Sequence, residues 1–270
     1  MQEVLGLAGQ PALVVGGGYG SGRETARLLA RAGARVAVAD IDGDRARAVA
    51  QEIGGHAIAG DVTSETGAAA MVDEAAHALG GLTRLANIVG GVKLAPFLST
   101  DLAHWQDQMN FNLYQQMGVC KAAGKHMQAA GQGSIALVSS VTGIYGARNQ
   151  VAYGAAKAAL ISFVKTLADE WGAYGIRVNS VAPDNTLTSR LIDRTGQPAA
   201  KALAEFDSRA AADGAPLRRG GREREIAGPL LFLLSDLSSF MTGQCLVVDG
   251  GLMVHFPHPA VDALGKGPAS

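Results

Sequence analysis

Short apolar runs alternate along the chain with longer, Ala-rich segments that suit helices. The apolar runs lie at residues 12–17, 35–41, 56–62, 82–91, 133–140, 175–183 and 243–251. Most are partly β-branched and show no strict polar alternation, which is typical of strands buried on both faces of a parallel sheet. Helix-compatible segments lie between them at 23–34, 44–54, 67–80, 101–130, 150–172 and 222–235. The alternation predicts an α/β fold made of repeated strand–helix–strand units.

We find no internal repeat and no linker that would divide the chain. Residues 1–254 are therefore expected to form one catalytic domain, with a substrate loop at about 187–221. Within that loop, residues 189–221 are polar and contain Gly and Pro, so we expect them to be irregular. Residues 255–270 are rich in Pro, Gly and Ala. They are predicted to be a C-terminal extension on the surface or against a partner subunit.

Composition excludes several classes of protein. The 270 residues carry a formal net charge of -1 without a basic block, which argues against nucleic acid or an anionic membrane surface as a partner. No apolar run reaches about 18 residues, so no membrane span is expected. Two cysteines form no disulfide framework, and the N-terminal residues lack a basic leader. These features favour a cytoplasmic protein.

A glycine-rich turn follows the first predicted strand. In VVGGGYGSGRETA, Gly16, Gly20 and Gly22 fit Gly-x-x-x-Gly-x-Gly at the start of a helix. Glycines there allow a sharp turn and let the helix N-terminus face a pyrophosphate. A purely structural turn is the alternative for this motif alone.

An acid ends the next strand, as a dinucleotide site requires. Asp40 lies 18 residues after Gly22, where a carboxylate accepts hydrogen bonds from ribose hydroxyls and repels a 2′-phosphate. The predicted cofactor is therefore NAD, although Arg23 and Arg45 nearby leave NADP open. The predicted contacts of this half of the cofactor are Gly16, Gly18, Tyr19, Gly20, Ser21, Gly22, Asp40 and Ile41.

A phenol and an ammonium lie one helical turn apart in VAYGAAKAAL. Tyr153 and Lys157 are four residues apart, so both side chains emerge on the same helix face. A nearby ammonium favours the phenolate form of a tyrosine, whose ordinary pKa is about 10. The pair is thus a candidate acid/base unit, against the simpler interpretation of a solvated face with a chance pair.

Taken with further motifs in a fixed order, the chain resembles the short-chain dehydrogenase/reductase family over roughly residues 5–254. The motifs are the glycine turn, Asp61-Val62, Asn87-Ile88-Val89-Gly90, Asn112-Leu113, SSVTGIYG with Ser140, YGAAK, RVNSVAP, Pro183-Asp184 followed by Thr186 and Thr188, and TGQCLVVDGG. The resemblance implies a single Rossmann-type, doubly wound parallel sheet of about seven strands with helices on both faces. It also implies a homotetramer or homodimer.

The resemblance implies a role for each matched residue. Tyr153 is the general acid/base for an alcohol or ketone substrate, and Ser140 donates a hydrogen bond to the substrate oxygen. Lys157 binds the nicotinamide ribose, and Asn112 supports a water-mediated proton path through Lys157. The further cofactor contacts that it implies are Asp61, Val62, Asn87, Gly90, Tyr153, Lys157, Thr186 and Thr188.

The chain departs from the family pattern at several positions. Val15 and Ser21 replace a Thr and an Ile in the glycine turn, Thr83 replaces an Asp, Ile88-Val89 replace Asn-Ala, Asp184 replaces a Gly, and Thr186 replaces a Val or Ile. The departures at Ile88-Val89 and Asp184 motivate one alternative, a non-catalytic NAD-sensing protein. A 3-oxoacyl-thioester reductase is another, and Asp40 argues against it because such reductases usually favour NADPH.

The substrate is not fixed by the motifs. The segments expected to surround it are 91–97, 142–150 and 187–215. Leu94, Phe97, Ile144 and Tyr145 suggest an apolar or cyclic substrate, whereas Arg148 and Asn149 suit a polar group. No metal site is predicted, because His255 and His258 lack a third ligand nearby.

Overall fold

The centre of the protein is one parallel sheet. We describe a computed structural model of residues 2–254, with the side chains of residues 4–254 except that of Arg190. The strands run in the order β3-β2-β1-β4-β5-β6-β9, and every pair is parallel. Their bounds are β1 Pro11–Val15, β2 Arg35–Asp40, β3 His56–Ala59, β4 Arg84–Asn87, β5 Gly133–Val138, β6 Ile176–Pro183 and β9 Cys245–Val248. The predicted seven-stranded Rossmann-type sheet is confirmed.

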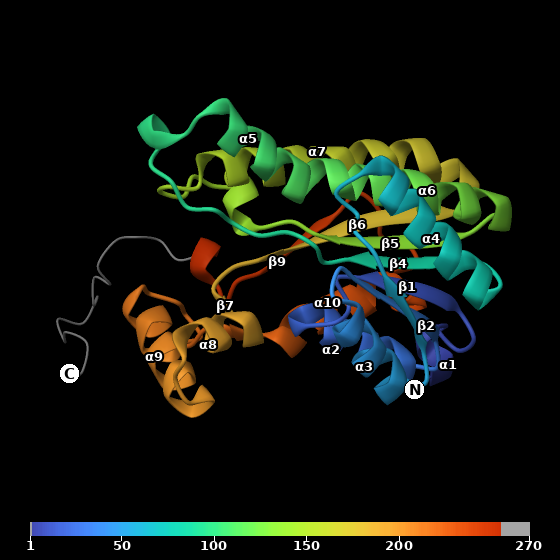
Figure 1. Cartoon of the computed structure of the whole chain (residues 1–270), viewed down its shortest axis with the longest axis horizontal. Helices are drawn as coiled ribbons and strands as arrows, with labels where there is room; N and C mark the ends of the chain where they lie inside the picture. Colours follow the sequence, from blue (N-terminus) through green and yellow to red (C-terminus); the bar gives the residue numbers. More distant parts are fainter. Residues whose placement is uncertain (1, 255–270) are drawn as a thin grey trace, which may run out of the picture.

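Helices cover both faces of this sheet (Figure 1). One face carries α2 Gly20–Arg31, α3 Gly43–Ile53 and α10 Glu223–Leu234, together with the short α1 Gln2–Leu5. The other face carries α4 Glu65–Leu79, α5 Leu102–Met109, α6 Gln115–Ala130 and α7 Val151–Trp171. The short helical turns are η1 Phe97–Ser99, η2 Asn110–Tyr114, η3 Val141–Gly143, η4 Gly172–Tyr174, η5 Asp236–Ser238 and η6 Leu252–Val254.

Alternate residues of each strand supply two separate cores. On β1, Leu13 and Val15 belong to the core beneath α4, α6 and α7, whereas Val14 packs with the helices of the opposite face. All three side chains are fully or almost fully buried. Burial of a side chain of this size stabilises the fold by about 1.5–3 kcal/mol. A sheet that is apolar on both faces needs the two helical layers, and this is why the strands appear in the sequence as continuous apolar runs.

The prediction that residues 189–221 are irregular is wrong. They contain α8 Ser189–Thr195 and α9 Ala199–Ala212, and β7 Thr186–Leu187 pairs with β8 Gly221–Arg222 in a small second sheet. The side chain of Thr188 caps α8, and Pro198 starts the Ala-rich run of α9, which favours a helix despite its polar residues. Both helices lie beyond the carboxyl ends of the strands (Figure 1).

The helix predicted for residues 101–130 is interrupted. It consists of α5, the wider π-helical turn η2 and α6, and Asn112 lies in the wide turn. Such turns recur at functional sites. Residues 255–270, with His255 and His258, lie outside the described residues, so the predicted extension stays a prediction.

One described helix is long and apolar enough to cross a membrane by length and composition alone. It spans Val151–Tyr174 and includes α7. In the fold it packs against the sheet, and Leu160 and Val164 belong to the core. A core helix of a globular domain meets the same criterion, so this observation is weak support for a membrane span.

Candidate active site

The predicted site residues gather at one edge of the sheet. The glycine turn follows β1, and Asp40 and Asn87 end β2 and β4. Ser140 and Asp184 lie shortly after β5 and β6. Because all seven strands are parallel, their carboxyl ends share this edge, which is where ligands bind in open α/β sheets.

The glycine turn leaves no space for side chains at Gly18 and Gly22. Gly16 and Gly20 have φ values of +76° and +59°, a region that glycine adopts without strain. A Cβ atom on Gly22 would overlap the carbonyl oxygen of Gly16, and one on Gly18 would lie 2.8 Å from the carboxylate of Asp40. The backbone is therefore bare at the N-terminus of α2, as close approach by a pyrophosphate requires.

Asp40 lies directly beneath this turn. One carboxylate oxygen accepts a hydrogen bond from the Gly18 N–H at 3.0 Å, and the other accepts from the Asp42 N–H at 3.0 Å. Each oxygen retains capacity for a further donor, so the carboxylate is held in place and can still accept hydrogen bonds from two ribose hydroxyls.

Tyr19 joins the glycine turn to the substrate loop. Its ring lies 4.6 Å from the guanidinium of Arg45 and 5.7 Å from that of Arg23, measured to the ring centroid. Its hydroxyl donates a hydrogen bond to Asp193 of α8. Burial, followed by the contact with Asp193, raises the pKa of Tyr19. The two arginines singled out in the sequence thus lie on the aromatic ring beside Asp40.

Beyond β3, Asp61 and Val62 also lie near this edge. Asp61 accepts a hydrogen bond from the Thr63 N–H at 2.8 Å, and this bond lowers its pKa. Val62 is buried, whereas Ile41 after Asp40 is exposed. Asp61 and Val62 therefore lie beyond the carboxyl end of β3, and their role as cofactor contacts stays a prediction.

Two glutamines that the sequence analysis missed form hydrogen bonds to the segment in which Ile88-Val89 depart from the family pattern. The buried Asn87 amide donates to Gln115 at 3.0 Å and accepts from the Val89 N–H at 3.1 Å. Gln115 and Gln116 both donate to the Val89 carbonyl, at 2.9 and 3.0 Å. Two consecutive glutamines within the predicted helix 101–130 are the sequence feature that corresponds to this network, which holds the segment after β4 in place.

Asn112 holds Gly91, further along the same segment. Its amide oxygen accepts from the Gly91 N–H at 2.9 Å, and its nitrogen donates to the Gly91 and Gln108 carbonyls at 3.0 Å. A Cβ on Gly90 would lie 2.9 Å from the Asn112 oxygen and 3.0 Å from Lys157 Nζ. Asn112 and Lys157 therefore meet at Gly90, where a larger residue would press against the ends of both side chains.

Lys157 is buried with one described hydrogen-bond partner. Its side chain is 2% exposed, and Nζ donates to the Val138 carbonyl at 2.8 Å. Burial lowers its pKa from 10.5 to about 7. Nζ lies 5.7 Å from the ring centroid of Tyr153, so the sequence-predicted pair is brought together.

Tyr153 behaves differently from the sequence-based expectation. Its pKa is raised above the ordinary value of 10, chiefly by burial; a hydrogen bond with Ser140 lowers it, and the charge of Asp184 raises it. Ser140 also accepts hydrogen bonds from the Thr142 N–H at 3.2 Å and the Thr142 hydroxyl at 3.0 Å. Burial also lowers the pKa of Lys157 to about 7, so this amine is neutral at the pH where the phenol loses its proton and gives the phenolate no positive charge there.

The segments predicted to surround the substrate also meet. The Ala95 N–H donates to the Asn149 carbonyl at 2.9 Å, which joins 91–97 to 142–150. The Tyr145 hydroxyl donates to Asp184 at 3.4 Å, a contact that the sequence did not predict.

Two further predicted cofactor contacts, Thr186 and Thr188, already have partners within the chain. The Thr186 hydroxyl donates to the Asp184 carbonyl at 2.7 Å, and the Thr188 oxygen caps α8. Across the described residues, no group of three His, Cys, Asp or Glu side chains is placed to hold a metal ion.

The residues fit a nicotinamide dinucleotide. The bare glycine cradle, the anchored carboxylate of Asp40 and the buried lysine beside a phenol provide places for a pyrophosphate, an adenosine ribose and a nicotinamide ribose. The places for the pyrophosphate and the two riboses all lie along the carboxyl edge of the sheet.

Comparison with known proteins agrees with this geometry. Residues 17–253 match a family model described as enoyl-(acyl carrier protein) reductase. D-threitol dehydrogenase of Mycolicibacterium smegmatis is 33% identical over 92% of this chain and 94% of its own. Cis-4-hydroxycyclohexanecarboxylate dehydrogenase of Sinomonas cyclohexanicum is 39% identical over 91% and 97%. The structure of 7α-hydroxysteroid dehydrogenase complexed with NADH and 7-oxo glycochenodeoxycholic acid superposes with a TM-score of 0.83, at 32% identity over 93% and 97%. The chain belongs to the short-chain dehydrogenase/reductase family.

Proposed function

We propose that the protein is an NAD(H)-dependent oxidoreductase that interconverts a secondary alcohol and a ketone, with Tyr153 as general acid/base. Oxidoreduction of alcohols with a nicotinamide cofactor is the activity that its relatives' names support. The observation that carries the residue assignment is the meeting of Ser140, Tyr153 and Lys157 beyond the carboxyl ends of the strands.

Within this proposal, each side chain has a defined task. When bound, the nicotinamide ring accepts or returns the hydride. Tyr153 takes the hydroxyl proton of the alcohol, and its hydrogen bond with Ser140 favours the phenolate that this requires. Once a substrate is bound, the single hydroxyl proton of Ser140 turns from Tyr153 to the substrate oxygen and donates a hydrogen bond to it. A protonated Lys157, 5.7 Å from the ring centroid, adds positive charge on the side of the phenol.

NAD, rather than NADP, is supported by Asp40. Its carboxylate is fixed by two backbone N–H groups, so it cannot turn away from a 2′-phosphate without losing both hydrogen bonds. Arg45 and Arg23 are the opposing consideration, because their guanidinium groups lie on the same side. Both are engaged with the Tyr19 ring, and Arg45 also pairs with Asp42 at 3.1 Å.

The two alternatives have less support. A thioester reductase that uses NADPH conflicts with the charge of Asp40. A non-catalytic sensor was motivated by the departures at Ile88-Val89 and at Asp184. At the first of these, Gln115 and Gln116 donate to the Val89 carbonyl and hold the backbone in place. With that segment ordered and the three catalytic side chains together, an enzyme is the better-supported function.

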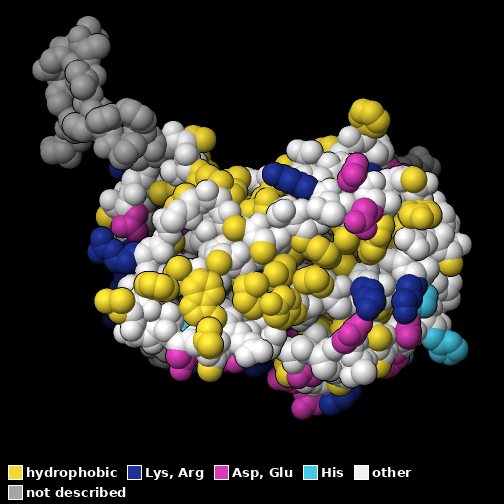
Figure 2. Space-filling model, turned by 90° about the horizontal axis from the view of Figure 1, so that it is seen from above, with side chains coloured by type: hydrophobic (Ala, Val, Ile, Leu, Met, Phe, Trp, Pro, Cys, Tyr) yellow, Lys and Arg dark blue, Asp and Glu magenta, His cyan; other side chains and the backbone are white. Residues whose placement is uncertain are grey.

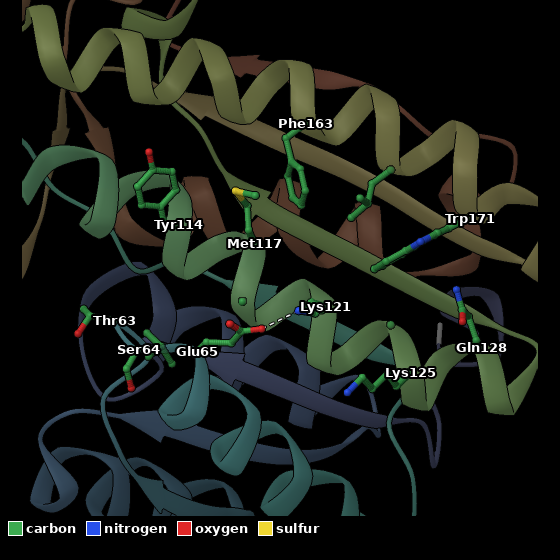
Figure 3. Close-up of a pocket in the computed structure, with 14 residues that line it drawn as sticks. Thr63, Ser64, Glu65, Tyr114, Met117, Lys121, Lys125, Gln128, Phe163 and Trp171 are labelled. Atoms are coloured by element: carbon green, nitrogen blue, oxygen red, sulfur yellow. Dashed lines mark hydrogen bonds and ion pairs between the residues drawn. The ribbon is translucent and has the colours of Figure 1, made fainter. Parts of the chain in front are cut away.

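The proposed assembly is a homodimer or homotetramer in the cytoplasm. The face formed by α6 and α7 carries a concentration of apolar side chains (Figure 2). A hollow of about 650 Å³ on this face is lined by Tyr114, Met117, Phe163 and Trp171, with Lys121 and Glu65 paired at its rim (Figure 3). An exposed apolar surface rimmed by charges is typical of a protein interface.

The direct test of the proposed activity is formation of NADH, followed by its absorbance, across a panel of secondary alcohols. The panel covers polyols, cyclic alcohols, sterols and hydroxy acids, and is repeated in reverse with the matching ketones and NADH. Oxidation of at least one class with NAD supports the proposal. Binding of NAD without turnover of any class, in either direction, would contradict it and favour the sensor.

A further inference from the structure

Asp184 brings a carboxylate to a position where the family pattern has a residue without a side chain. It directly follows Pro183, the last residue of β6. Its backbone is held on both sides, since its N–H donates to Val248 at 3.2 Å and its carbonyl accepts from Thr186 at 2.7 Å. The side chain therefore projects from a fixed point of the backbone.

That point lies beside the reacting centre. Val138 of β5 and Val181 of β6 are register partners, so the segments carrying Ser140 and Asp184 leave adjacent strands at the same edge. Tyr145, five residues after Ser140, reaches across and donates to the carboxylate. The charge of Asp184 acts on Tyr153 and raises the pKa of that phenol. The carboxylate thus lies close to the groups that handle the substrate oxygen.

Asp184 is only weakly engaged within the chain. Its one described side-chain contact, the Tyr145 hydroxyl at 3.4 Å, is long for an O–H···O bond. Among the side chains that the structure describes, no lysine or arginine forms an ion pair with it. Asp249 adds a second negative charge, since it also raises the pKa of Tyr145. A partly exposed carboxylate with one long internal contact retains acceptor capacity for a hydroxyl group of a bound substrate.

We propose that Asp184 determines specificity by accepting a hydrogen bond from a second hydroxyl of the substrate, so that the substrate is a neutral vicinal diol or polyol. This inference rests on the proposed function, because it places the first hydroxyl at Ser140 and Tyr153. The second hydroxyl takes the place of the Tyr145 hydroxyl on the carboxylate. The same negative charge repels alcohols that carry a carboxylate or phosphate close to the reacting carbon.

The expected effect is measurable as a ratio of kcat/KM values. A hydrogen bond to a charged group contributes enough to change an equilibrium by about ten- to hundredfold. The wild type should therefore oxidise butane-2,3-diol at least about tenfold better than butan-2-ol, and cis-cyclohexane-1,2-diol better than cyclohexanol by a similar factor. The anionic 3-hydroxybutanoate should be the poorest secondary alcohol of this size.

Three variants separate the charge from other effects. Asp184→Gly, which restores the family residue, should reduce the diol preference to within about threefold. Asp184→Asn keeps one acceptor oxygen but removes the charge, so it should retain part of the preference and improve the use of 3-hydroxybutanoate. Asp73→Asn, on the exposed face of α4 with only a surface contact to His126, is the matched control and should leave all ratios unchanged.

Folding and cofactor binding are measured on every variant by circular dichroism and NADH fluorescence. Tyr145→Phe provides a second route, because it frees the carboxylate without removing it and should keep the diol preference. Equal use of diols and mono-ols by the wild type, or an undiminished preference in folded Asp184→Gly, would overturn the inference alone. Failure of the wild type to oxidise any alcohol would instead overturn the proposed function.

Discussion

The buried Lys157 should make the stability of the cofactor-free protein depend on pH. Its side chain is 2% exposed, and burial lowers its pKa from 10.5 to about 7. Between these values the unfolded chain binds a proton that the folded chain does not. Stability therefore rises as the pH increases through this window and is lost as the pH falls toward 7.

The magnitude follows from the pKa alone. Each pH unit inside the window contributes about 1.36 kcal/mol, so the wild type should gain about 2–3 kcal/mol from this group between pH 7 and pH 9. Lys157→Met removes the titrating group. The substitution leaves the Val138 carbonyl without its described side-chain partner, at a cost of about 1–3 kcal/mol that does not depend on pH.

The assay is urea unfolding, followed by the fluorescence of Trp105 and Trp171, at pH 7 and pH 9 and at fixed protein concentration. The free energy of unfolding of Lys157→Met relative to wild type should fall by about 2–3 kcal/mol from pH 7 to pH 9. Lys165→Met, at an exposed position of the same helix, is the control and should show no such change. Identical pH dependence of wild type and Lys157→Met would refute the account of a buried, depressed ammonium.

The remaining predictions concern the cofactor and the assembly. Asp40→Ala removes a charge that repels the 2′-phosphate, so the ratio of the NADP dissociation constant to the NAD dissociation constant should fall by about tenfold or more. Both constants are measured by fluorescence titration. Tighter binding of NADP than of NAD to the unaltered protein would contradict the NAD assignment. Met117→Asp places a charge in the apolar hollow between α6 and α7, so it should shift the protein toward monomers in sedimentation experiments, whereas Asp73→Asn should not. An unchanged sedimentation profile of Met117→Asp would contradict the proposed interface.

Local patterns in the sequence were sufficient to predict the sheet. Strands buried on both faces, such as β1 and β5, appear as uninterrupted apolar runs, and the order of runs and helices determines a parallel arrangement. The segment 189–221 was predicted incorrectly because its Gly, Pro and polar residues outweighed the Ala-rich run of α9. The segment has helix-forming residues at 199–212 and a capping residue, Thr188, but it lacks the apolar stripe that would have indicated a helix.

Site residues could be predicted from the sequence only where the chemistry needs a particular residue type at a particular spacing along the chain. Parallel strands bring their carboxyl ends together, so the motifs after separate strands had to meet. Contacts between distant segments leave no such pattern, and the bonds from Tyr145 to Asp184 and from Tyr19 to Asp193 were missed for that reason. The direction of the pKa change of Tyr153 was also missed, because burial depends on packing that the sequence does not state.

The most direct test of the central claim is the turnover of Tyr153→Phe. The change removes one hydroxyl, so binding of NADH, measured by fluorescence, should stay within a few-fold of wild type. Turnover of the best alcohol in the panel should fall by about 10²–10⁴-fold, the usual contribution of a positioned general acid/base. Tyr174→Phe, at an exposed position just after α7, should retain full turnover. Turnover of Tyr153→Phe within tenfold of wild type would contradict the account.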